Sequence, residues 1–141
     1  MSKDLILLIA RVLLSIMFLT GGIFKFMDPS GTVGMLTQAG FPAPAILNYL
    51  AGIFELLAAI AILIGFQTKL ASFALAAFCV FTALVFHSSE INIPDFPEAA
   101  NGLLSLFNFL ILQKNLAVAG GFLALAIAGP GAWSVDGRRS A

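Results

Sequence analysis

The chain has 141 residues, of which 60% are hydrophobic and 10% are charged, and its mean hydropathy is +1.05. Soluble domains carry about 25% charged residues, so this composition excludes a soluble globular protein and predicts one integral membrane domain over residues 1–141. The net charge is zero and no basic run is present, which argues against a nucleic-acid partner. Cys79 is the only cysteine, so we expect a buried, inert thiol, no disulfide and no metal site.

The first predicted membrane span covers about residues 5–25. It is too long for the apolar part of a signal peptide and it contains a charge, so we expect it to be retained. A four-three spacing places five residues on one helix face: Arg11, Ser15, Phe18, Gly22 and Lys25. Arg11 and Lys25 lie near the two ends, where each could reach the lipid headgroups or line an interior site. Their shared stripe with Gly22 favours the interior position.

The first connection is predicted to contain a short helix. Asp28 and Pro29 favour a helix start, and the helix is expected to run to about Ala39 and to stop at Gly40. We expect this piece to lie on the membrane surface or over the mouth of the bundle.

The second predicted span, about residues 46–66, carries a single carboxylate, Glu55, near its centre. A carboxylate at that depth is costly unless it faces the protein interior and finds a partner. The positions that share its face are Asn48, Gly52, Ala59 and Ile62. Small residues let another helix approach closely, so we expect Glu55 to face a neighbouring helix. Its cationic partner stays open at this point.

The third predicted span, about residues 70–87, has a stripe of small residues and ends at His87. A polar loop over residues 88–102 follows, and the fourth span covers about residues 105–128. Gln113, Lys114 and Asn115 interrupt that last apolar run, which we expect to be one long helix with a start outside the membrane. Lys114 shares a face with Ala117 and Gly121 and is expected to point where helices pack closely.

Basic residues indicate the orientation of the four spans. One side carries Lys3, Lys69, Arg138 and Arg139. Because cytoplasmic loops are enriched in lysine and arginine, we predict an all-α, integral membrane four-helix bundle with both termini cytoplasmic. Lys25 and His87 then lie near the outer end.

The order of these residues resembles the DoxX family of small bacterial four-span inner-membrane proteins over nearly the whole chain. The likeness is carried by Arg11, the segment 22–25, Glu55, Gly65, Thr68, the segment 86–88, Lys114, Asn115, Gly120 and Gly121, and by the closing Gly129-Pro130-Gly131, Ser134 and Asp136. One departure is the long acidic stretch between His87 and Lys114, where similar proteins often have a shorter connection.

The resemblance implies a multi-pass protein of the bacterial inner membrane. Some members are linked to oxidation of reduced sulfur compounds with electrons passed to quinone, others to tolerance of quinones, catechols or oxidative stress, and many are described only as oxidoreductases. The resemblance supplies no catalytic residue, and whether the chain is an enzyme stays open. No haem-ligand pair, flavin motif or cysteine pair is present in the sequence, so a redox role requires a quinone or a partner redox subunit instead of a covalent cofactor.

The charged residues suggest where a ligand site lies. Arg11, Glu55 and Lys114 are expected to share the interior of the bundle, with Asn115 beside them and with His87 and Lys25 toward the outer mouth. One cation would neutralise Glu55 and leave another for an anion or a quinone carbonyl. Alternatively these charges only pair and set the helix register, or Glu55 and His87 relay protons.

Three classes of function follow. The leading one is an accessory or subunit of a quinone-linked redox or stress-detoxification system in the lipid bilayer. The second is a proton-coupled transport or binding protein that uses Glu55. The third is a non-catalytic membrane scaffold, because small-residue stripes also join helices of different chains, including those of a homo-oligomer.

Overall fold

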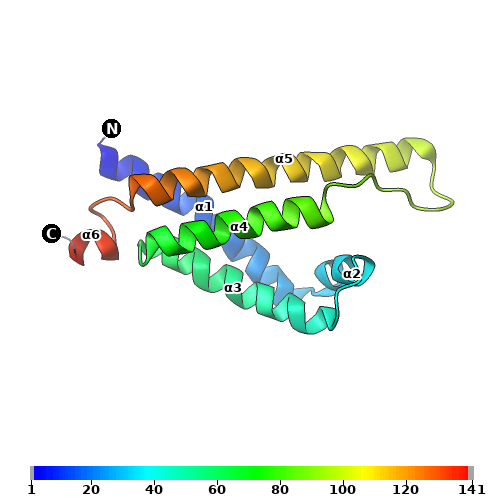
Figure 1. Ribbon diagram of the computed structural model, residues 1–141, viewed down its shortest axis with the longest axis horizontal. Helices are drawn as coiled ribbons and strands as arrows, with labels where there is room; N and C mark the ends of the chain where they lie inside the picture. The colour runs from blue at the N-terminus through cyan, green and yellow to red at the C-terminus, as the bar shows by residue number, and fades with distance from the viewer. Residues whose placement is uncertain (1, 140–141) are drawn as a thin grey trace.

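The computed structural model describes residues 2–139, which form helices and connections only. The helices are α1 Lys3–Met27, α2 Ser30–Gln38, α3 Pro44–Ile64, α4 Thr68–Phe86, α5 Glu98–Ala128 and α6 Val135–Arg139 (Figure 1). Four of these, α1, α3, α4 and α5, are long and apolar enough to cross a membrane. The prediction of an all-α chain with four apolar spanning helices is confirmed, whereas the side on which the termini lie stays a prediction.

The helix ends follow local sequence rules. The Ser2 hydroxyl accepts a hydrogen bond from the backbone N–H of Leu5 at the start of α1. The Asp28 carboxylate accepts one from the backbone N–H of Ser30 at the start of α2. Gly65 ends α3 with a φ of +68°, a left-handed conformation that favours glycine. The short helix predicted after Asp28 and Pro29 is therefore present.

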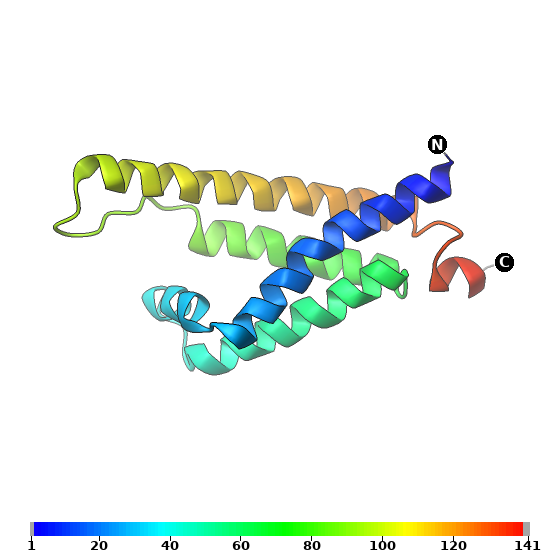
Figure 2. The same ribbon diagram turned by 180° about the vertical axis from the view of Figure 1, so that it is seen from behind.

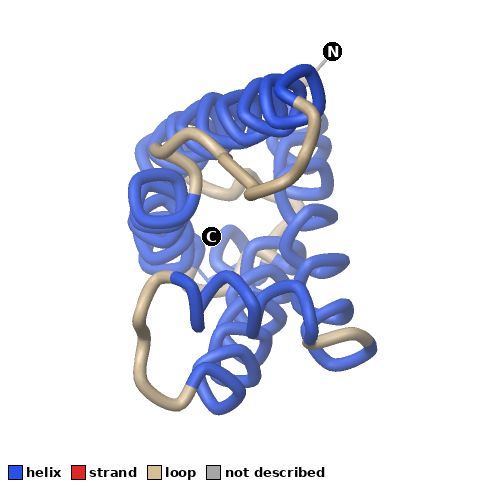
Figure 3. Tube along the Cα trace, turned by 90° about the vertical axis from the view of Figure 1, so that its right-hand side faces the viewer, coloured by secondary structure: helices blue, strands red, loops and turns tan. Residues whose placement is uncertain are grey.

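The four long helices form two pairs. α1 packs chiefly against α3 and α4 against α5, while contacts between the two pairs are fewer. The pairs meet at the end that carries both termini and diverge toward the end that carries α2 (Figures 1 and 2). Seen along the long axis, the helices surround a common centre (Figure 3). This divergence creates the space in which the candidate site lies.

The predicted interior faces of the first three spans are confirmed. The buried residues of α1 are Leu7, Arg11, Ser15, Phe18 and Gly22. Those of α3 are Asn48, Gly52, Glu55, Ala59 and Ile62. Aromatic rings connect the two pairs, because Phe18 of α1 packs 5.5 Å from Phe122 of α5 and 6.4 Å from Phe78 of α4.

The fourth span agrees with its prediction in one respect and differs in another. α5 is unbroken through Gln113–Asn115 and begins at Glu98, ahead of the predicted span of about residues 105–128, as expected for one long helix. At ~1.5 Å per residue it is about 46 Å long, more than a bilayer core of about 30 Å, and it projects past the end of α4 (Figure 1). The prediction of which face of α5 packs closely is wrong: Lys114 and Ala117 are exposed, whereas Asn108, Asn115 and Phe122 are buried.

Polar residues in the first turns of α5 hold the preceding loop. Asn101, Ser105 and Asn108 follow an i, i+4, i+7 spacing and so lie on one helix face. The Asn101 side chain accepts a hydrogen bond from the backbone N–H of Ile93 in the preceding loop and donates one to its carbonyl oxygen. The Ser105 hydroxyl does the same with the backbone N–H and carbonyl oxygen of Ile91. Residues 88–102, predicted as a polar loop, are therefore partly helix and partly a loop that is hydrogen-bonded to this helix.

Candidate functional site

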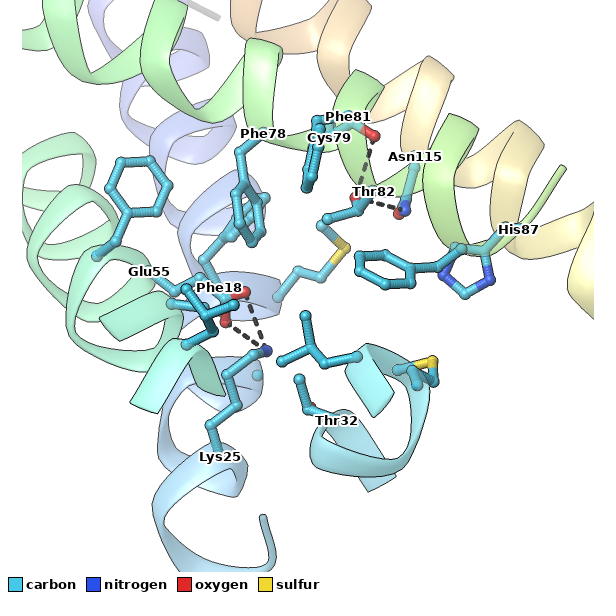
Figure 4. Close-up of a pocket in the computed structure, with 18 of the residues that line it drawn as sticks. Phe18, Lys25, Thr32, Glu55, Phe78, Cys79, Phe81, Thr82, His87 and Asn115 are labelled. Carbon is cyan, nitrogen blue, oxygen red and sulfur yellow. Dashed lines mark hydrogen bonds and ion pairs between the residues drawn. The ribbon is translucent and has the colours of Figure 1, made fainter. Parts of the chain in front are cut away.

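A cavity of about 760 Å³ lies between the two helix pairs where they diverge (Figure 4). Helices α1 to α5 all contribute to its walls, which are mostly apolar. Its aromatic lining consists of Phe18, Phe41, Phe54, Phe78, Phe81 and Phe86. Ligand pockets in proteins are typically about 300–1,000 Å³ and apolar with a few polar groups, so this cavity has the size and character of a small-molecule site.

The polar group at the α1–α3 wall is an ion pair. The Nζ of Lys25 lies 3.0 Å from each carboxylate oxygen of Glu55, and the two side chains are 15% and 5% exposed (Figure 4). The structure thus identifies Lys25 as the cation that the sequence left open. The pair is neutral as a unit, which lowers the cost of placing two charges in an apolar region.

Two local features allow this pairing. Gly22 and Gly52 face one another, since a Cβ at Gly22 would lie 3.1 Å from the carbonyl oxygen of Gly52, so α1 and α3 approach closely. The buried Asn48 side chain donates a hydrogen bond of 2.9 Å to the carbonyl oxygen of Lys25, which fixes the end of α1 against α3. The Lys25 side chain then reaches back along α1 to Glu55.

His87 stands at the opposite edge of the cavity from Lys25 and Glu55 (Figure 4). Its Nδ1 lies 2.7 Å from Oδ1 of Asn108, and Nδ2 of Asn108 donates to the carbonyl oxygen of Ser89 at 2.9 Å. The half-buried imidazole is therefore held in one orientation by α5. Its predicted position near one end of the bundle is confirmed.

Lys114 and Asn115 line the same cavity from α5. Asn115 is buried and donates to the Thr82 hydroxyl at 3.2 Å, which ties α5 to α4. Lys114 is exposed and adds a positive charge at the rim. Cys79 also lines the cavity and is buried with a free thiol, as expected.

Arg11 does not belong to this site. Its guanidinium is fully buried near the chain termini, where Nη1 donates to the carbonyl oxygen of Leu63 at 3.0 Å and Nη2 donates to that of Trp133. Arg11 and Lys25 are fourteen positions apart on α1, which is about 21 Å along the helix. Arg11 is interior, as predicted, but it does not line the cavity beside Glu55, because α1 carries its two cations to opposite ends of the bundle.

The segment after α5 closes the end of the bundle that Arg11 occupies. The Asp136 carboxylate accepts hydrogen bonds from the backbone N–H groups of Gln67 and Thr68, at 3.0 and 2.9 Å, and from the Thr68 hydroxyl at 2.9 Å. It thereby caps the start of α4 from a distant part of the chain. Burial alone would raise the pKa of Asp136, but the bonds from Thr68 and Gln67 and the charge of Arg139 lower it below its ordinary value.

Sequence reasoning missed three residues that organise these two regions: Asn108, Thr82 and Asp136. Asn108 could have been found from the polar i, i+4, i+7 spacing on an otherwise apolar helix. Asp136 carried a signal only through the family resemblance, and its target on α4 lies 68 positions away. Among residues 2–139 no group of His, Cys, Asp or Glu is arranged to hold a metal ion.

Comparisons with known proteins identify relatives of this chain. The DoxX family model matches residues 6–88. The chain belongs to the DoxX family. It is 37% identical to the inner membrane protein YqjF of Escherichia coli over 95% of this chain and 92% of that protein. It is 34% identical to the E. coli inner membrane protein YphA over 97% of this chain and 92% of that protein.

This DoxX protein is accordingly a multi-pass protein of the inner membrane. Lys25, Glu55 and His87 fall within the matched residues, whereas Asn108, Lys114 and Asn115 follow them. No solved structure matches the chain significantly.

Proposed function

We propose that this DoxX protein binds a quinone or a similar ring compound from the bilayer, as an accessory or subunit of a membrane redox or stress-detoxification system. The observation that carries the proposal is the apolar cavity between the helix pairs, with the Lys25–Glu55 pair in its wall. The proposal concerns binding by this chain; the redox group that reacts with the quinone belongs to a partner subunit.

The lining of the cavity suits a flat apolar ring. Phenylalanines from three helices and from the α2–α3 connection surround the space, and aromatic rings pack well against the face or edge of another ring. Phe41, which follows α2, contacts Phe81 and Phe86 of α4 at ring distances of 6.3 and 5.9 Å. The α2 connection therefore closes part of the mouth, and its aromatic contacts are of the kind that a ligand ring could replace.

The polar groups suit the oxygen atoms of a quinone. An ammonium group is a hydrogen-bond donor, so Lys25 and Lys114 can each donate to a carbonyl oxygen that enters the cavity. Lys25 needs no counter-ion from the ligand because Glu55 already neutralises it. A neutral ring with polar oxygens consequently fits the Lys25 wall better than a strongly charged solute does.

The test is mass spectrometry of small molecules that copurify with gently solubilised protein. We expect quinone to be enriched in the wild type and reduced in Ala77→Trp, because Ala77 lines the cavity and an indole there would occupy part of the space that a ligand ring needs. Ala124→Trp is the matched control, since Ala124 is exposed on α5 and does not line the cavity. Equal quinone in all three samples, or quinone in none, would contradict the proposal.

A proton-coupled carrier is the second candidate, because Glu55 is a titratable group in the wall of the cavity. A carrier must open at both membrane faces, and here the terminal end is closed by bonds from Arg11 and Asp136. Uptake assays in vesicles with wild type and Glu55→Gln separate the two functions: uptake that depends on a proton gradient and disappears in a variant that is still folded would favour the carrier.

A further inference from the structure

The hydrogen-bond partners of His87 determine which of its nitrogens carries the proton. Nδ2 of Asn108 is engaged with the carbonyl oxygen of Ser89, so the atom of Asn108 that faces His87 is the acceptor Oδ1. The imidazole must therefore donate from Nδ1. A neutral imidazole has a single N–H, and in this arrangement Nε2 is bare and can only accept a hydrogen bond.

We propose that His87 is a specificity-determining residue of the cavity: its bare Nε2 accepts a hydrogen bond from a ligand hydroxyl, so the site prefers a quinol or another phenol over the matching quinone. The inference rests on the proposed function and extends it to the form of the ligand.

The two edges of the cavity are then complementary in chemistry. At the α1–α3 wall Lys25 can only donate, and at the α4 edge a His87 ring protonated at Nδ1 alone can only accept at Nε2. A hydroquinone satisfies both, because each hydroxyl both donates and accepts. A quinone has acceptors alone, so it would place a carbonyl oxygen against a nitrogen lone pair at His87. Leaving a polar group in an apolar site without a partner is costly, and this cost produces the preference.

The first experiment determines which nitrogen of the His87 imidazole carries the proton. His87 is the only histidine of the chain, so protein labelled with ¹⁵N-histidine and purified without a polyhistidine tag reports on this one residue. We expect the ¹⁵N shifts of the neutral tautomer protonated at Nδ1, and a loss of that tautomer preference in Asn108→Leu. Asn101→Leu is the matched control, because Asn101 also binds the loop backbone from α5 but makes its bonds at Ile93 and Asn92.

The second experiment measures binding of three probes in lipid nanodiscs under anaerobic conditions: a short-chain alkylhydroquinone, its benzoquinone and its dimethyl ether. We expect the hydroquinone to bind about three- to tenfold more tightly than the other two, the effect of one neutral hydrogen bond. The preference should disappear in His87→Phe, which keeps a ring at that position. Only the hydroquinone should shift the Nε2 resonance.

The outcomes separate this inference from the proposed function. If all three probes bind equally and their affinities do not change in His87→Phe, the cavity binds rings but His87 does not select among them. This result overturns the inference and leaves the proposed function standing. If none binds, both are overturned. A ring protonated at Nε2, or a charged one, in the ligand-free protein also overturns the inference, because Nε2 would then be a donor.

Discussion

The Nζ of Lys25 lies 3.0 Å from the carboxylate of Glu55, although thirty positions separate the two residues in the chain. This salt bridge joins α1 to α3 in the wall of the cavity and neutralises the carboxylate of the second span. Both side chains are largely shielded, so the pair has structural as well as functional consequences.

Removal of Glu55 should destabilise the fold more than removal of both charges. Glu55→Gln leaves the Lys25 charge in an apolar region without its counter-charge, and we expect a loss of about 3 kcal/mol in the free energy of unfolding. The double variant Lys25→Met, Glu55→Gln should recover much of this loss. The free energies of unfolding in mixed micelles, measured for the wild type, both single variants and the double variant, complete the double-mutant cycle. Strictly additive changes in these free energies would show that the two side chains do not interact.

Arg11 should hold the C-terminal segment in place. Arg11→Lys keeps the charge but cannot reproduce a fork that donates to both Leu63 and Trp133, and we expect a loss of about 2 kcal/mol. The segment after α5 should become more sensitive to added protease. Lys69→Arg, at an exposed position, serves as the control. Unchanged cleavage in Arg11→Lys would contradict this function of the guanidinium.

Acid should weaken the contact of the Asp136 carboxylate with the start of α4. Its pKa in the folded protein is below the unfolded value of about 3.9, so its stabilisation is present above that value and declines as the pH falls through the lower folded value. The difference in stability between wild type and Asp136→Asn should therefore be largest near neutral pH and shrink below about pH 4. A difference that does not change with pH would contradict the capping contact as its source.

Two glycines should respond oppositely to alanine. Gly65 has a φ of +68° and would place a Cβ against Ser134 and Arg11, so Gly65→Ala should cost at least about 1–2 kcal/mol. Gly120 lies within α5, and nothing outside its own helix backbone comes within 4 Å of the Cβ position, so Gly120→Ala should stabilise the fold by about 0.5–1 kcal/mol. Thermal unfolding measures both. A loss of oligomers in Gly120→Ala, with an intact fold, would instead favour the scaffold function.

The orientation of the chain is open to a direct measurement. We predict that both termini are cytoplasmic, because Lys3, Lys69, Arg138 and Arg139 lie at the same end of the bundle (Figure 1). Reporter fusions at residue 139 and in the 88–97 loop should be active on opposite sides of the inner membrane. A periplasmic C-terminus would reverse the topology and place the mouth of the cavity toward the cytoplasm.

The sequence by itself determined the class of protein, the four apolar helices and the inward faces of the first three. Those properties depend on composition and on the 3.6-residue period, which are local features of the amino-acid sequence. It also identified Glu55 as a buried carboxylate that needs a partner, because the cost of such a group in a membrane does not depend on the details of the fold.

Only the tertiary structure decided which residues meet. Arg11 and Lys25 share one helix face, and the crossing of α1 over α3 sends the first to Leu63 and the second to Glu55. The partnership of His87 with Asn108 and the capping of α4 by Asp136 likewise depend on how distant helix ends are brought together. Periodicity specifies which face of a helix is buried, but not which helix packs against that face or at what position along its axis. The cavity exists only because two helix pairs meet at one end and diverge at the other.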